Sequence, residues 1–327
     1  MRRREFITLL GGAMTWPLAA RAQEPAKLPT IGFIGTETPD VYTDRLRAFH
    51  LGLKSTGFTE GQNVVIEYCW AEGHHDRYPE LTADLVRRQV DVVVAASTPS
   101  VLVAKAATTT IPIVFFTAGD PVDLGLVASL SRPDKNLTGA TTLTLEVGPK
   151  WVQLMHEMVP NATSLALLIN PTSANLAEAQ SKDLQAAARS RGLQLHVLQA
   201  STDREFETAF ASVARLGASG LVISSDSFFF SRSAQLAKLA ISHAVPTIFG
   251  FREFVTAGGL MSYGGSITES FRWMGVYTGR VLKGEKLADL PVQRSTKIEL
   301  FINLKTAQAL GLEVPPTLLT RADDVIE

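Results

Sequence analysis

The sequence predicts an α/β protein built from two doubly wound parallel-sheet lobes joined by a hinge of several strands. Short apolar runs alternate with segments of helical periodicity along most of the chain, which is typical of parallel sheets. This order of elements occurs twice in succession. The last eighty or so residues are long enough to return to both halves. A length of 327 residues, with 46% hydrophobic and 19% charged residues, suits about two globular domains.

The first residues have the pattern of an export signal. Arginines at positions 2–4 precede an apolar stretch over 7–20, and Ala20 and Ala22 fit the small positions of a cleavage site. The arginines followed by Phe6 resemble a twin-arginine signal, which exports folded cargo. The alternative is a basic amphipathic first helix. No later apolar run is long enough to span a bilayer, so we expect a soluble periplasmic protein.

The first half predicts strands that are each followed by a helix. The expected strands lie at 30–34, 64–70, 90–96 and 113–116. The last of these leads into Thr117–Asp120, which we expect to lie in a cleft beyond the carboxyl ends of the strands. Asp120-Pro121 has the composition of a helix start, and Arg132-Pro133 would end that helix. The alternative is that Asp120 is only a helix cap.

The second half repeats the order of elements without repeating the sequence. Strands are expected at 165–170, 193–198, 220–224 and 245–249, with helices at 147–158, 175–190, 204–216 and 231–243. A strand at 260–263, a helix at 266–282, a polar crossover at 283–291 and a strand at 297–303 follow.

These elements predict a division of the chain into three parts. Residues 1–22 form the signal peptide. The first lobe takes 30–142 plus about 251–282, and the second takes 143–250 plus about 283–327.

Several functional classes are excluded by what the sequence lacks. A net charge of −1 argues against nucleic acid as a partner, and a single cysteine, Cys69, cannot form an internal disulfide. The sequence contains no G-x-G-x-x-G, H-E-x-x-H, C-x-x-C or G-x-S-x-G motif. The nearest metal-like group, residues 74–76 (His-His-Asp), is interpreted as a solvated turn. None of the six histidines falls on a predicted strand-end loop, so we expect neither catalysis nor a metal or cofactor.

Polar side chains recur where the predicted strands end. The candidate ligand-binding residues of this kind are Thr36, Ser97, Thr98, Ser100, Thr117, Asp120, Asn170 and Asp226. Ordinary helix capping explains roughly half of such residues, and the other interpretation is a hydrogen-bonding cleft between the lobes. Helix amides near 97–100 and 117–120 suit a carboxylate, whereas Asp226 suits an ammonium group. Phe228, Phe249 and Tyr263 could form apolar walls, although each is more often a core residue.

The chain resembles substrate-binding proteins of ABC transporters with the type I periplasmic-binding fold, in the group that includes tryptophan- and tyrosine-binding members. The stretches that carry the resemblance span nearly all of the mature chain. They are FFTAGDPVDLGLVASLSRPDKNLTG, LLINPTSANLAEAQSKDLQAAARSRGLQL, VPTIFGFREFVTAGGLMSYGGS and KIELFINLKTAQALGLEVPP. Family proteins usually have Asp-Asn in the second lobe where this chain has Asp226-Ser227, followed by three phenylalanines.

The resemblance implies a monomeric two-lobed binder that closes on an amino acid-like or aromatic carboxylate ligand and presents it to an ABC permease. By analogy, Ser97, Thr98 and Ser100 would bind the carboxylate and Asp226 the amino group. Thr117, Asp120 and Asn170 would then line the hinge side of the cleft. A periplasmic sensor subunit with a membrane signalling partner is an alternative, and an exported enzyme on the same scaffold is a weaker one.

Overall fold

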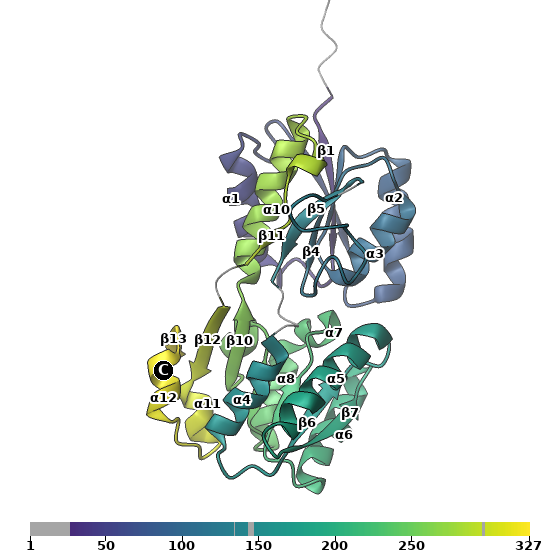
Figure 1. Cartoon of the computed structure of the whole chain (residues 1–327). Coiled ribbons are helices and arrows are strands. Elements are labelled where there is room, and N and C mark those ends of the chain that lie inside the picture. Colours follow the sequence, from purple (N-terminus) through teal and green to yellow (C-terminus); the bar gives the residue numbers. More distant parts are fainter. Residues whose placement is uncertain (1–26, 134, 143–146, 296–297) are drawn as a thin grey trace, which may run out of the picture.

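The computed structural model describes residues 27–133, 135–142, 147–295 and 298–327. It contains two sheets with helices on both faces of each, arranged as two lobes one above the other (Figure 1). The α/β prediction is therefore confirmed. The predicted signal peptide at 1–22 lies outside the described residues. None of the described helices is long and apolar enough to cross a membrane.

The first lobe is a parallel sheet in the order β11-β5-β4-β3-β1-β2. Its strands are β1 (Thr30–Gly35), β2 (Val65–Trp70), β3 (Val92–Ala95), β4 (Ile113–Thr117), β5 (Leu137–Thr141) and β11 (Gln293–Arg294). Helices α1 (Thr43–Ser55) and α10 (Ile267–Leu282) cover one face, and α2 (Tyr78–Arg87) and α3 (Thr98–Ala107) cover the other. The strands alternate accordingly, since Phe33 packs with the first pair and Ile34 with the second.

The second lobe has the order β13-β12-β10-β9-β8-β6-β7, in which β12 runs antiparallel to β10. Its strands are β6 (Ser164–Ile169), β7 (Gln194–Gln199), β8 (Leu221–Ile223), β9 (Thr247–Phe249), β10 (Met261–Gly265), β12 (Ile298–Asn303) and β13 (Asp324–Ile326). One face carries α4 (Gly148–Met158), α5 (Ala174–Arg189), α11 (Leu304–Ala309) and α12 (Pro316–Arg321). The other carries α6 (Asp203–Arg215), α7 (Ser227–Phe230), α8 (Ser233–Ser242) and α9 (Arg252–Thr256).

The chain passes between the lobes three times, after β5, after β10 and after β11. Strand β10 belongs to the second sheet because it pairs with both β9 and β12, whereas β11 pairs with β5 in the first sheet. The predicted boundaries had placed 251–282 with the first lobe and 283–327 with the second. Strand pairing instead assigns the segment through β10 to the second lobe and the segment from α10 through β11 to the first, so the boundaries fall where the chain crosses between the lobes.

The helix predicted after Asp120-Pro121 is not formed. The segment begins with one helix-like turn, in which the Leu124 amide bonds the Asp120 carbonyl at 3.0 Å, but Gly125 then adopts a positive φ of 63°. A left-handed residue there ends the turn before a second one can form. The chain continues through turns to β5, so the first lobe has three βα units and not four.

Helices α1 and α10 pack closely against each other in the first lobe. Gly52 of α1 and Gly275 of α10 face the opposite helix, and a Cβ at either position would collide with backbone atoms of that helix. Glycine therefore allows the two backbones to approach and holds α1, with the loop before it, against the lobe that α10 completes.

Candidate functional site

Asp226 follows β8 and is the buried carboxylate of the second lobe, with 4% of its surface exposed. Its Oδ1 accepts hydrogen bonds from the Asn170 side chain at 3.0 Å and from the Phe228 amide at 2.9 Å. Asn170 is itself oriented, because its Oδ1 accepts from both the amide and the hydroxyl of Thr172. Among the described residues, no hydrogen bond reaches Asp226 Oδ2. The carboxylate is thus held rigidly through one oxygen, and the other can receive a donor.

Beside Asp226, Gln180 and Ser225 present further polar atoms. The Ser225 amide donates to Gln180 Oε1 at 2.9 Å. Gln180 Nε2 and Ser225 Oγ are buried and have no hydrogen-bond partner within the described part of the chain. Unpaired buried groups are rare, and a bound ligand or water is a common explanation for them. Sequence reasoning missed Gln180, since it lies in the middle of α5 and far from any strand end.

Ser97 and Ser100 at the start of α3 are bonded to each other. Ser97 Oγ accepts from the Ser100 amide at 3.3 Å, and Ser100 Oγ accepts from the Ser97 amide at 3.0 Å. This reciprocal cap satisfies two amides of the first turn. Ser100 is fully buried, so its hydroxyl serves the helix start.

Thr98 and Thr117 join the ends of β3 and β4. Their hydroxyls lie 2.7 Å apart, and Thr117 Oγ1 also accepts from the Gly119 amide at 3.2 Å. Thr117 is fully buried, whereas Thr98 is half-buried. As the first residue of α3, Thr98 has an amide without an intrahelical partner. Of the three candidates at 97–100, Thr98 therefore offers the most to a ligand.

Tyr78 lies beside the end of β3. Its hydroxyl lies 3.4 Å from Ser97 Oγ, and burial raises the pKa of Tyr78 to about 12, with a further contribution from the negative charge of Asp226. Nearby, the Thr36 amide donates to the Tyr42 hydroxyl at 3.1 Å. The structure thus brings candidates that follow β1, β3 and β8 to one place.

Two other candidates near the strand ends make local contacts. Asp120 Oδ1 accepts from the Val122 amide at 2.6 Å and so caps its own turn. Phe228 is buried, and the guanidinium of Arg232 lies 4.4 Å from the centre of its ring.

Phe249 and Tyr263 lie within the packing of the second lobe. Phe249 is fully buried, in edge contacts with Phe251 and Phe254 on the face that carries α8 and α9. Tyr263 packs on the opposite face, and its carbonyl accepts from Trp151 Nε1 at 2.6 Å. The two aromatic side chains are therefore not on one wall.

His75 contacts the opposite lobe. Its Nε2 lies 3.0 Å from Ser227 Oγ, and its ring stacks on Tyr78 at 5.6 Å. Burial lowers the pKa of His75; the charge of Asp226 opposes this shift and that of Arg232 adds to it. The interpretation of 74–76 as a solvated turn is therefore wrong for His75, although His74 is exposed. No group of three potential metal ligands occurs among the described residues.

Glu37 and Arg45 form a buried ion pair that was not among the residues predicted from the sequence. Arg45 Nη1 lies 3.6 Å from Glu37 Oε2, and both side chains are 4% exposed. Burial raises the pKa of Glu37, and the charge of Arg45 opposes that rise. The Arg45 guanidinium also lies 3.8 Å from the ring centre of Phe230, which belongs to the other lobe.

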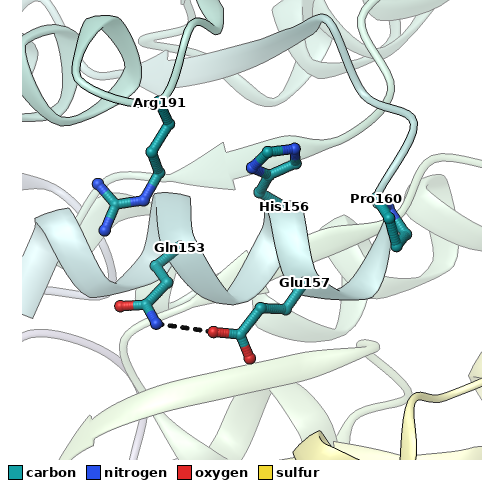
Figure 2. Close-up of a pocket in the computed structure, with 5 residues that line it drawn as sticks. All are labelled: Gln153, His156, Glu157, Pro160 and Arg191. Atoms are coloured by element: carbon teal, nitrogen blue, oxygen red, sulfur yellow. Dashed lines mark hydrogen bonds between the residues drawn. The ribbon is translucent and has the colours of Figure 1, made fainter.

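A surface pocket of about 550 Å³ lies elsewhere on the second lobe (Figure 2). Gln153, His156 and Glu157 of α4 line it together with Pro160 and Arg191, and Gln153 Nε2 donates to Glu157 Oε1 at 2.7 Å. Pro160 and Arg191 precede the amino ends of β6 and β7. The pocket is therefore at the opposite end of the sheet from Asp226.

Known proteins share both the sequence pattern and the fold. Residues 38–326 match the family described as ABC transporter substrate binding protein. A tyrosine-binding protein of Clostridioides difficile is 26% identical over 269 residues, which cover 82% of this chain and 76% of that protein.

Solved structures add to this picture. A conserved domain protein from Vibrio cholerae has a TM-score of 0.82 and 26% identity, and covers 91% of this chain and 100% of its own. An ABC domain in complex with L-Trp from Streptococcus pneumonia has a TM-score of 0.81, 24% identity and the same coverage. The ligand-free, open structure of a substrate-binding protein from Clostridium difficile has a TM-score of 0.66, with 24% identity, 91% of this chain and 99% of its own.

Proposed function

The chain belongs to the family of ABC transporter substrate-binding proteins, and from that premise we propose that it is the exported receptor of an importer for an amino acid or an aromatic carboxylic acid. The observation that carries the ligand class is Asp226, a buried carboxylate oriented through Oδ1 by Asn170 and by the α7 amide. A buried charge of this kind needs a partner of opposite charge, and the ammonium group of an amino acid supplies one.

The first lobe complements that charge with neutral donors. The amide and hydroxyl of Thr98 would bind the ligand carboxylate at the start of α3, where the helix dipole favours an anion. Ser97 and Ser100 would fix the position of Thr98 through their mutual cap. Thr117 would hold the Thr98 hydroxyl in place.

Two similar proteins support an amino acid as the ligand. One is named a tyrosine-binding protein, and the other was solved with L-Trp. In this chain Gln180 Nε2 and Ser225 Oγ next to Asp226 would add two contacts that an amino acid or a water bound with it can satisfy.

The family and the N-terminal sequence support a transport role. The protein would work in the periplasm after export through the twin-arginine-like signal at 1–22 and would deliver its ligand to a permease in the inner membrane.

Calorimetric titration of the unfolded, dialysed and refolded protein tests the ligand class. We expect an α-amino acid or an aromatic acid to bind within a panel that contains tryptophan, tyrosine, phenylalanine, smaller amino acids and aromatic acids without an amine. Binding of the amine-free acids alone would overturn the role of Asp226. Absence of binding across the whole panel would overturn the ligand class.

A further inference from the structure

The segment that follows Asp226, residues 227–232, contacts the first lobe at three points. Ser227 Oγ lies 3.0 Å from His75 Nε2. The Phe230 ring lies under the guanidinium of Arg45. Arg232 lies against Gly73, so close that a side chain at that glycine would collide with its guanidinium. These are contacts between lobes, because residues 227–232 follow β8 of the second sheet and their partners lie in the first lobe.

Arg45 is the buried centre of these contacts. Its guanidinium lies 3.8 Å from the ring centre of Phe230 in the second lobe and 4.7 Å from that of Tyr42 in its own lobe. Arg45 is 3% exposed, and its Nε and Nη2 have no hydrogen-bond partner among the described residues. Aromatic faces thus replace the water that a guanidinium usually keeps, and Glu37 at 3.6 Å is its ionic partner.

We propose that residues 227–232 form an interlobe clasp, in which the Phe230 ring covers Arg45 only while the lobes are closed. Opening the lobes withdraws Phe230 and returns water to the guanidinium. On closure, the guanidinium therefore loses hydration and gains a cation–π contact. Because these two free-energy terms have opposite signs, the clasp changes the free-energy difference between the closed and open forms only modestly. A balance of this kind allows the lobes to close partly without ligand and still to reopen.

The position of the clasp couples it to the ligand. Asp226 Oδ1 accepts from the Phe228 amide and so begins α7, the helix that presents Phe230. A ligand held by Asp226 would fix the start of α7 and hence the position of the ring. This coupling rests on the proposed function, whereas the clasp itself is a property of the ligand-free protein and can be tested without a ligand.

The test measures the distance between the lobes in ligand-free protein. Spin labels at Leu51→Cys on α1 and Ile241→Cys on α8, both exposed, report the closed and open populations by pulsed dipolar spectroscopy, in a Cys69→Ser background. The variants are Phe230→Leu, which keeps an apolar side chain without a π face, Arg45→Met, which keeps the length without the charge, and the double variant.

We expect Phe230→Leu to lower the closed-to-open ratio by about tenfold, the size of a desolvated cation–π contact. Arg45→Met should change the ratio less, because it removes both the contact and the hydration that the guanidinium gains on opening. In the double variant, Phe230→Leu should lower the ratio no further than Arg45→Met alone, because the contact is already absent. Phe301→Leu is the matched control, since the Arg252 guanidinium lies 4.6 Å from the Phe301 ring within the second lobe alone. It should leave the ratio unchanged.

An unchanged distance distribution in Phe230→Leu would overturn the clasp, and so would losses that add in the double variant. Should Arg45→Met fail to fold, a comparison of the closed-to-open ratios of Phe230→Leu and Phe301→Leu still tests the clasp. Failure of every amino acid to bind would overturn the proposed function and leave this result intact.

Discussion

The two lobes bring different chemistry to the boundary between them. In the first lobe the hydroxyls are bonded to one another, Ser97 with Ser100 and Thr98 with Thr117, so their geometry exists before any ligand arrives. In the second lobe a charged group, Asp226, stands beside Gln180 Nε2 and Ser225 Oγ, which have no hydrogen-bond partner among the described residues. Under the proposed function, the first lobe would supply shape and neutral donors, whereas the second would supply the charge that selects the ligand.

Removing the charge of the second lobe should have the largest effect. Asp226→Ala should weaken binding of an amino acid by about 3 kcal/mol or more, because it leaves the ligand ammonium buried without its partner. Asp226→Asn should lose a similar amount while retaining the oxygen that caps α7. Titration calorimetry measures both.

Asp120→Asn is the matched control in the first lobe. It makes the same change of charge and keeps the acceptor for the Val122 amide. Equal losses of affinity at Asp120 and Asp226 would contradict the division of roles between the lobes.

A smaller effect is expected from pH at the contact between the lobes. Burial lowers the pKa of His75 in the closed form, and opening returns it to water. Below the ordinary histidine pKa of about 6.5, His75 binds a proton in the open form but remains neutral in the closed form. Acid therefore favours opening. Affinity should therefore be constant above about pH 7.5 and fall on acidification by at most tenfold per pH unit.

The comparison of two glutamine variants isolates this effect. His75→Gln can still bond Ser227 but does not titrate, and its affinity should not change between pH 7.5 and 5.5. His74→Gln, at an exposed neighbour, should behave as the unchanged protein does. The same acid response in all three proteins would place the titrating group elsewhere.

The smallest effects should separate the two roles within the first lobe. Ser97→Ala removes a helix cap and should lower the free energy of unfolding by about 1 kcal/mol, with little change in affinity. Thr98→Val removes a hydroxyl offered to the ligand and should weaken binding about fivefold. Thermal unfolding and calorimetry of both variants check this. A reversed pattern would mean that Ser97 contacts the ligand.

Local pattern predicted most of the elements in these lobes. The apolar runs at 30–34 and 165–170 correspond to β1 and β6. Ser97 caps the start of α3, as a serine placed before a helical segment is expected to do. The prediction of a helix from Asp120-Pro121 was wrong, because residues that favour the start of a helix do not determine whether the following residues continue it. Gly125 ends the segment after one turn.

Contacts made by the other lobe could not be read from local sequence. His75 is half-buried and contacts Ser227, which lies 152 positions further along the chain. Arg45 did leave a signal, since Tyr42, Arg45 and Phe49 share a helical spacing and place a charge on an apolar face. A charge in that position indicates a buried partner, here Glu37, but not that Phe230 of the second lobe covers it.

The three passages of the chain between the lobes have a consequence for engineering. The first sheet needs β11 from far downstream to complete its edge, and the second needs β12 and β13 from beyond that point. A single cut therefore cannot release either lobe intact, and a chimaera that exchanges one lobe with a relative requires three junctions. Recombination should then replace whole receptors more readily than halves, and new ligand preferences should arise by point substitution within loops such as the one that carries Asp226.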